Sequence, residues 1–293
     1  MGASQLAMEL QAVCHSGADR SRTCLLKLPV ALVEDVRPGG DALCENFQIA
    51  FPYRGLFIWH VGQDDVVGDA NQALFVTGGE HYRLSQPIPG GYAELILTPT
   101  DDIVAELAHQ NRGNLGAHAL FRRRSRRLHP GLQSHRTRFL FWALGASNGD
   151  GLAAEEHVLA LLRSVLEDDA PRHNPSRSTQ KLIARTKAYL ETELAHPIRL
   201  GDVGSFVGAS PVYLTQVFRA VEGIPLHRYL TQLRLARALV ELPSADDLTQ
   251  LALGVGFSSH SHFSAQFRRA FGTTPSQFRE QSRRRVGPLS IQH

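Results

Sequence analysis

The stretch LALGVGFSSHSHFSAQFRRAFGTTPSQFR, residues 251–279, decides the fold of the last third of the chain. Phe263, Phe267 and Phe271 recur every four residues, a spacing that places side chains on one side of a helix. Gly256 interrupts an apolar helical pattern just before them. The stretch therefore predicts a short helix, a turn, and a second helix with a buried phenylalanine stripe.

An earlier segment repeats this pattern at a constant offset of 49 residues. The matched pairs are Ser210 and Ser259, Leu214 and Phe263, Phe218 and Phe267, Arg219 and Arg268, and Gly223 and Gly272, with Val203 and Ala252 and then Phe206 and Val255 upstream. In each unit a serine stands where a helix N-cap is expected, and a glycine where the helix should end. Two such units favour a pair of helix-turn-helix motifs over a plain helical bundle.

The segment between the two units, residues 224–242, has a long apolar face and predicts a single helix. Such a helix spans roughly 25–28 Å at about 1.5 Å per residue. That length could hold two reading helices about one DNA turn apart on one side of a duplex. His260 and His262 are two residues apart and so do not share a helical face, which argues against a metal pair there.

The net charge also differs between the first and the last part of the chain. Residues 1–169 carry 15 Lys and Arg against 20 Asp and Glu, a charge of −5, and residues 170–293 carry 16 against 8, a charge of +8. A basic C-terminal part indicates a polyanionic partner. The hydrophobic content of 43% and the charged content of 20% are those of an ordinary globular protein.

Residues from about 179 to 281 resemble the DNA-binding domain of the AraC/XylS family of bacterial transcription regulators. The resemblance rests on ASPVYLTQVFRAVEGIPLHRYLTQLRLARA, residues 209–238, and on the stretch 251–279. The positions that match the family signature are Gly256, Phe257, Ser259, Phe263, Phe267, Gly272, Pro275 and Phe278. The resemblance implies an all-α domain with two helix-turn-helix units joined by a long helix, which reads two successive segments of the DNA major groove.

The same resemblance assigns roles to residues near the starts of the two recognition helices. The expected base contacts are Val212, Thr215 and Gln216 in the first and His260, Ser261, Ser264 and Ala265 in the second. A glutamine suits adenine, and short apolar side chains can touch a thymine methyl group. The expected phosphate contacts are Arg219, Arg268 and Arg269.

The first half of the chain reads as short strands separated by glycine-rich turns such as RPGGD, TGGE and PIPGG. This pattern predicts a small β-barrel or a sandwich. Helical periodicity follows at residues 131–146 and 153–166. Leu159, Leu162, Val165 and Leu166 form an apolar stripe that suits either a dimer contact or packing on the strands.

The segment VVGDANQALFVTGGEHYRLSQP, residues 66–87, is similar to cupin domains, which implies an effector-binding and dimerisation domain. Enzymes of the cupin type need a set of metal ligands that includes an HxH pair, and this half lacks one. We therefore expect no enzyme activity, no metal and no cofactor. The candidate effector-binding residues are Trp59, His60, His81 and Arg83. Strand alternation points His81 and Arg83 one way and Tyr82 the other, so surface positions remain an alternative.

Two further features leave alternatives open. The arginine run FRRRSRRLHP, with Arg122, Arg123, Arg124, Arg126 and Arg127, could bind an anion, but a solvated edge segment is favoured. Cys14, Cys24 and Cys44 match no zinc spacing, and so few cysteines indicate a reducing compartment. Incidental thiols are favoured over a thiol or metal sensor.

Together these features predict two domains: residues 1–168 as a cupin-like, mainly β barrel followed by two helices, and residues 179–285 as the DNA-binding domain. Residues 169–178 would be a linker and residues 286–293 a tail. We expect a cytoplasmic homodimer that binds double-stranded DNA and a small-molecule effector and acts with RNA polymerase, away from membranes. The alternatives are a ligand-independent or thiol- or metal-responsive regulator and, less favoured, a cupin enzyme fused to a DNA-binding domain.

Overall fold

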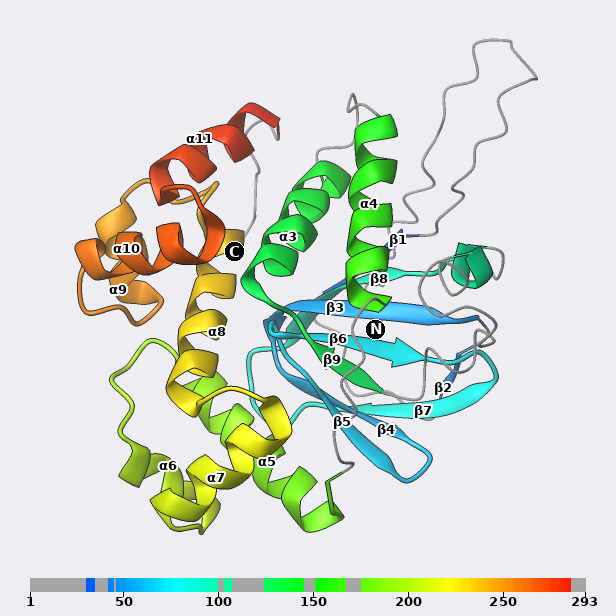
Figure 1. Cartoon of the computed structure of the whole chain (residues 1–293), viewed down its shortest axis with the longest axis vertical. Coiled ribbons are helices and arrows are strands. Elements are labelled where there is room, and N and C mark those ends of the chain that lie inside the picture. The colour runs from blue at the N-terminus through cyan, green and yellow to red at the C-terminus, as the bar shows by residue number, and fades with distance from the viewer. Residues whose placement is uncertain are drawn as a thin grey trace, which may run out of the picture.

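The structure is a computed structural model that describes residues 30–34, 42–44, 46–99, 103–106, 124–144, 151–166 and 175–285. In the described part, nine strands form two antiparallel sheets that precede a group of helices (Figure 1). The first sheet has the order β1 (Val30–Glu34), β8 (Tyr92–Leu97), β3 (Gln48–Gly55), β6 (Gln72–Val76), β9 (Ser125–Arg127). The second has the order β2 (Ala42–Cys44), β7 (Glu80–Ser85), β4 (Phe57–Val61), β5 (Asp64–Gly68).

The two sheets pack face to face. Their shared core contains Phe57, Trp59 and Val61 from β4 and Leu74 and Tyr92 from the opposite sheet, all buried. Strand β4 alternates between buried and half-buried residues, as period-two patterning requires. The described strands do not close on one another, so of the two predicted alternatives they form a sandwich, and the cupin-like barrel is not confirmed.

The outer face of the five-stranded sheet is covered by α3 (Pro130–Leu144) and α4 (Gly151–Leu166). These two helices begin within two residues of the predicted positions. Along α4 the buried residues Val158, Leu161, Leu162 and Val165 join the core with residues of the sheet. This side of α4 therefore packs on the strands, which is the second of the two alternatives given above for the apolar stripe.

Seven helices make up the C-terminal part. They are α5 (Arg177–Thr192), α6 (Leu200–Val207), α7 (Pro211–Glu222), α8 (Leu226–Glu241), α9 (Leu248–Gly254), α10 (His260–Phe271) and α11 (Pro275–Arg285). The predicted phenylalanine stripe is core, since Phe263 and Phe267 are fully buried. The long helix between the two units is confirmed as α8, a little shorter than residues 224–242.

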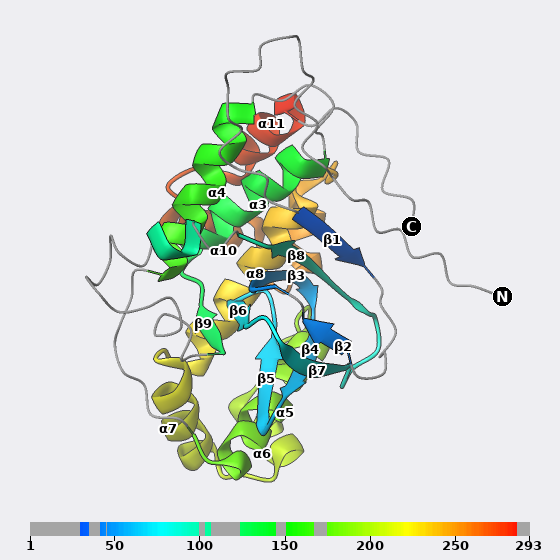
Figure 2. The ribbon, with the colours of Figure 1, turned by 90° about the vertical axis from the view of Figure 1, so that its right-hand side faces the viewer.

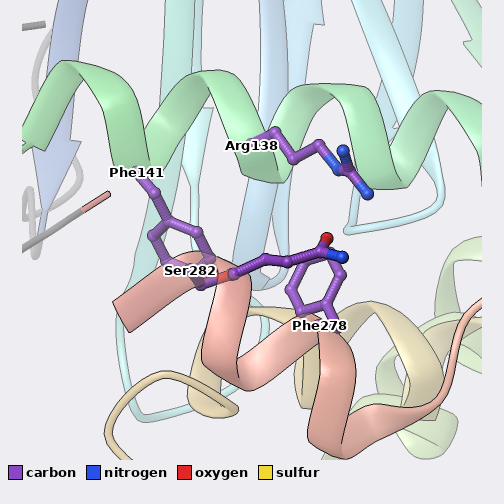
Figure 3. A pocket seen from close by; sticks show the side chains of 5 residues that line it. Arg138, Phe141, Phe278 and Ser282 are labelled. Atoms are coloured by element: carbon purple, nitrogen blue, oxygen red, sulfur yellow. The ribbon is translucent and has the colours of Figure 1, made fainter. Parts of the chain in front are cut away.

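Helices of the C-terminal part lie against both ends of the sandwich. Viewed from the side, α5 to α7 lie beyond one end of the sheets, and α3, α4 and α11 lie at the other (Figure 2). Helix α3 contacts α8, α10 and α11, and α8 also contacts β3. Arg138 and Phe141 on α3 point towards Phe278 and Ser282 on α11, and the Arg138 guanidinium lies 5.7 Å from the centre of the Phe278 ring (Figure 3).

Candidate nucleic-acid interface

The recognition helices α7 and α10 begin and end in the same way. The Ser210 hydroxyl accepts a hydrogen bond from the backbone N–H of Tyr213 at 3.3 Å, and the Ser259 hydroxyl accepts one from that of His262 at 3.1 Å. Each helix is then closed by a left-handed glycine, Gly223 with φ 73° and Gly272 with φ 72°. Every one of these positions repeats at the predicted offset, so the second recognition helix has the same ends as the first.

Each of the two recognition helices has one buried face and one exposed face. Leu214 and Phe218 of α7 and Phe263 and Phe267 of α10 are fully buried. The Phe218 ring meets the Tyr229 ring edge-on, with the ring centres 5.2 Å apart. Because the apolar stripe holds each helix on its neighbours, the remaining face is turned outward and is available to a partner.

The expected base-contacting residues all keep some exposure. Val212 is 67% exposed, and Gln216, Ser261 and Ala265 are also exposed, whereas Thr215, His260 and Ser264 are half-buried. Two of these side chains have partners within their own helix. The Thr215 hydroxyl donates to the Val212 carbonyl at 2.9 Å, and the Ser264 hydroxyl lies 3.3 Å from His260 Nε2. Val212, Gln216, Ser261 and Ala265 are therefore the more accessible members.

The expected phosphate contacts Arg219, Arg268 and Arg269 are exposed and stand in the last turn of their helices. A positive charge in the last turn interacts favourably with the helix dipole, so an arginine at these positions stabilises its own helix. Their exposure leaves the guanidinium groups accessible to a polyanion, and their role in binding one remains a prediction.

The two units differ in the turn that leads into the recognition helix. Phe206 is 48% exposed and lies beside the Tyr189 ring, with the centres 5.0 Å apart, whereas the matched Val255 is buried. The left-handed glycine is Gly208 in the first unit, and in the second it is Gly256, one position earlier than the offset predicts. The repeat therefore holds for the recognition helices and is looser in the turns before them.

A buried polar cluster joins the recognition unit to the sandwich. We give this name to Asp69, Gln72, Lys187, Glu222 and Tyr229, all of which are buried. Lys187 Nζ lies 2.8 Å from Glu222 Oε1 and 3.8 Å from Asp69 Oδ2. The Tyr229 hydroxyl donates to Asp69 Oδ2 at 2.5 Å, and Gln72 Nε2 donates to Glu222 Oε2 at 3.0 Å.

The electrostatics of the cluster follow from its burial. Removal from water acts to lower the pKa of Lys187, but Glu222 and Asp69 outweigh it, so the pKa is raised and the ammonium stays charged. Burial raises the pKa of Asp69, against the opposing effects of Lys187 and Tyr229. The two carboxyl groups thus share one ammonium group in a buried site. A charged group in such a site is stable only while it keeps its partners.

Further hydrogen bonds extend the contact between the two parts. Asn71 Nδ2 donates to the Tyr229 carbonyl at 3.1 Å, and Gln133 Nε2 donates to Asn71 Oδ1 at 2.6 Å. Arg136 on α3 is fully buried and donates to the carbonyls of Pro52 and Ala70. Sequence reasoning missed this set, because each residue alone resembles an ordinary surface residue, and its partners lie far along the chain.

The arginine run is not the solvated edge segment that was favoured. Arg124 pairs with Glu80 at 2.6 Å and lies 3.6 Å from Asp64. Arg126 donates to the Val165 carbonyl, and Arg127 donates to the Glu222 carbonyl at 3.2 Å and to Gln232 at 3.3 Å. Strand β9 is indeed an edge strand, but its arginines attach it to α4, α7 and α8. Arg122 and Arg123 lie outside the described residues.

The four candidate effector-binding residues lie on two faces of the second sheet: His60 pairs in register with Arg83 on the outer face, where His81 also lies, whereas Trp59 lies on the inner face. Trp59 points into the space between the sheets, where it packs in the shared core. His60 lies on the outer face of β4, with Nδ1 2.7 Å from Asp65 and Nε2 2.7 Å from Ser85. His81 and Arg83 are exposed, whereas Tyr82 between them packs on the shared core, as the alternation predicted.

Cys44 is buried at 3% exposure, and its thiol donates to the Asn46 carbonyl at 2.9 Å. Burial raises its pKa, which disfavours the reactive thiolate. Cys14 and Cys24 lie outside the described residues, as does most of the predicted linker. In the parts of the chain that the structure describes, no helix has both the length and the apolar character that crossing a membrane demands.

Comparison with known proteins places the match in the C-terminal part. A helix-turn-helix domain family matches residues 204–281. The regulatory protein SoxS of Escherichia coli is 35% identical over 103 residues, which make up 35% of this chain and 96% of SoxS. The regulatory protein PocR of Salmonella typhimurium is 26% identical over 48% of this chain and 49% of PocR. The chain thus spans about half the length of the latter.

The solved structures that match this chain have low overall similarity to it. The C-terminal domain of AraT from Geobacillus stearothermophilus has a TM-score of 0.35 and 27% identity, over 38% of this chain and 92% of that one. ToxT from Vibrio cholerae has a TM-score of 0.35 and 10% identity, over 89% of this chain and 99% of that one. The recognition helices with their matched caps, together with the coverage of SoxS almost from end to end, lead to one conclusion: this chain belongs to the AraC family of DNA-binding transcription regulators.

Proposed function

We propose that this chain controls transcription by reading double-stranded DNA with α7 and α10, under the control of a small molecule that binds between the two sheets. The observation that carries the proposal is the duplicated, identically capped pair of recognition helices, each with an exposed face that ends in arginine. The charge of +8 on residues 170–293 supports a polyanionic partner.

The buried polar cluster supports the control. Asp69 and Gln72 belong to the β5–β6 connection and the start of β6, whereas Glu222 is the last residue of α7 and Tyr229 lies on α8. A ligand that binds the two arrangements of these parts with different affinity would shift the population of the one that fits DNA. In this proposal, ligand binding affects the recognition helices through the side chains of the buried polar cluster rather than through the linker.

We place this activity in the cytoplasm, with RNA polymerase as the partner at a promoter, and we expect a homodimer. The dimer surface would lie elsewhere than on the buried side of α4, since Leu161, Leu162 and Val165 pack in the chain's own core.

The test begins with selection of bound sequences from a random duplex pool by the full-length chain. Recovery of a shared motif is expected, and recovery of none would contradict the proposal. Arg268→Ala should then weaken binding to selected and random DNA alike and lower the salt dependence by about one charge. Gln216→Ala should change the preference at one position, and Arg163→Ala, on the exposed side of α4, should leave both properties unchanged.

A further inference from the structure

Three polar atoms in the space between the sheets are buried without a hydrogen-bond partner. They are Trp59 Nε1, Tyr92 Oη and Glu94 Oε2. The three residues are only 3%, 1% and 3% exposed, respectively. Buried polar groups in native proteins are almost always hydrogen-bonded, so the unpaired Glu94 carboxyl oxygen in this set indicates a partner that the described residues do not supply.

These groups face a common space. Tyr92 and Glu94 are two residues apart on β8 and therefore lie on the same side of the strand. Tyr92 belongs to the core that the two sheets share, and Trp59 stands opposite it on β4. Burial raises the pKa of Tyr82 and of Tyr92, and the Glu94 carboxylate raises both further, which brings Tyr82 on β7 into the same neighbourhood.

Aromatic rings form a continuous wall beside the carboxyl group. The ring centres are 5.9 Å apart for Tyr82 and Trp59, 6.0 Å for Trp59 and Phe57, and 4.4 Å for Phe57 and Tyr92. Tyr82 is half-buried, so its ring lies at the rim of this wall, next to β2 at the edge of its sheet.

Glu94 lacks the partner that a buried acid needs. Its pKa is raised to about 8 by burial, and no lysine or arginine in the described part of the chain offsets that rise. The buried carboxyl groups of the polar cluster differ, since Lys187 lies beside both of them. An ionised carboxylate in such a place is stable only when a positive charge is brought to it.

The aromatic rings and the Glu94 carboxyl group determine which class of ligand fits this site. An anion would be repelled once Glu94 is ionised, above about pH 8, and a metal ion needs more ligands, because among the described residues no three His, Cys, Asp or Glu side chains gather in one place. Aromatic faces attract alkylated ammonium groups, and a carboxylate neutralises their charge. We propose that the space between the two sheets binds a small organic cation, an amine or a quaternary ammonium compound, with Glu94 facing its charge and Trp59, Tyr82 and Tyr92 facing its alkyl groups.

This site deepens the proposed function, since it names the chemical class of the effector. It differs from the predicted set in using Trp59 together with residues on the inner faces of β7 and β8, whereas His60, His81 and Arg83 lie on the outer face. Entry of the cation would move the Tyr82 ring at the rim.

The experiment uses the full-length chain and three probes of nearly the same shape: tetramethylammonium chloride, neopentyl alcohol and sodium pivalate. Thermal unfolding is followed at pH 8.5 over a concentration series, with sodium chloride at matched ionic strength. We expect a saturable rise of the midpoint with tetramethylammonium alone. No rise with this cation, or an equal rise with the neutral or anionic probe, would overturn the proposal.

Variants locate the site. Glu94→Gln keeps the size of the side chain and should weaken tetramethylammonium binding at least about tenfold. Tyr82→Leu, at the rim, provides a second variant and should weaken it several-fold, while Arg83→Ala on the outer face should leave it unchanged. Unchanged affinity in both Glu94→Gln and Tyr82→Leu would also overturn it. DNA binding is measured on the same preparations, so that failure of the cation site and failure of DNA reading are separate results.

Discussion

The Tyr229 hydroxyl on α8 donates a hydrogen bond to the Asp69 carboxylate at 2.5 Å, which joins residues 160 positions apart. The same hydroxyl lies 3.4 Å from Gln72 Nε2, and the Tyr229 carbonyl accepts a bond from Asn71. One residue of the helix between the two recognition units is thus held by three residues of the sandwich. Side-chain and backbone hydrogen bonds therefore attach α8 directly to the sandwich.

Tyr229→Phe removes this hydroxyl and leaves the ring in place. Asp69 then keeps Lys187 but loses its shortest hydrogen bond, so we expect a loss of about 1–3 kcal/mol in the free energy of unfolding, measured in urea. Tyr189→Phe is the matched control, because the Tyr189 hydroxyl lies at the surface, and its effect should stay within about 0.5 kcal/mol. Equal losses in the two variants would mean that the bond to Asp69 adds nothing.

Lys187→Met leaves two buried carboxyl groups without their cation. We expect a loss of about 3–5 kcal/mol at neutral pH, and partial recovery when Asp69→Asn and Glu222→Gln are added to the same chain. Lys181→Met changes an exposed lysine of the same helix and should have little effect. A triple variant no more stable than Lys187→Met alone would contradict the account of the cluster.

Glu94 makes stability depend on pH in a defined direction. Its pKa is raised by burial to about 8 from the usual 4.5 of a glutamate, so the folded state holds this proton over a range where the unfolded chain has released it. The resulting stabilisation is present at low pH and is lost as the pH rises from about 4.5 to about 8, by up to about 4 kcal/mol between pH 5 and pH 8.

Glu94→Gln removes that dependence. The variant should equal the parent protein near pH 5 and exceed it in stability at pH 8, as measured by urea unfolding at both pH values. Among the described residues, the titratable groups that interact with Glu94 are Tyr82 and Tyr92, and burial raises the pKa of both, so they stay neutral over this range. Parallel pH profiles for the variant and the parent would show that Glu94 does not titrate as described.

Gly208 and Gly256 both have a left-handed backbone conformation. Alanine substitution at each of them distinguishes the cost of backbone strain from the cost of steric overlap. Gly208 has φ 74° with open space where a Cβ would stand, so Gly208→Ala should cost about 1–2 kcal/mol from the left-handed backbone alone. A Cβ on Gly256 would lie 2.2 Å from the Leu194 carbonyl oxygen and 2.6 Å from Arg234 Nε. Gly256→Ala should therefore cost clearly more, since Arg234 donates to the carbonyls of Leu194 and His196. Equal costs in thermal unfolding would rule out the steric part.

The recognition helices α7 and α10 could be predicted almost to the residue because their signals are local. Ser259 and Gly272 mark the ends of α10 directly in the sequence, and the phenylalanines mark its buried face. Strands β5, β2 and β9 have weak signals in the sequence, because Asp64 and Asp65 of β5 resemble turn residues and the other two strands are only three residues long. The α7 and α10 side chains predicted to contact DNA are accessible, but accessibility alone does not distinguish a reading residue from a solvated one.

The contacts between the two parts could not be predicted from the sequence. Lys187 stands on an amphipathic helix and Glu222 at a helix end, where charged residues are usually solvated. Their burial arises only when α5, α7 and α8 meet the sandwich. Glu94 was likewise hidden in the strand sequence YAELIL, where period-two alternation places a carboxyl group inside without showing what it faces.

The direct contact through Asp69, Lys187, Glu222 and Tyr229 changes the role of the peptide between α4 and α5. Because these side chains, together with the contacts of α3 and β9, join the two halves directly, the halves resemble a heterodimer encoded on one chain, and the connecting peptide would serve as a tether that keeps their local concentration high. Cutting that tether would then lower the apparent affinity of the halves for each other without changing the geometry of their contact. The connecting segment could vary freely in length and composition, while the few residues that form the contact could not.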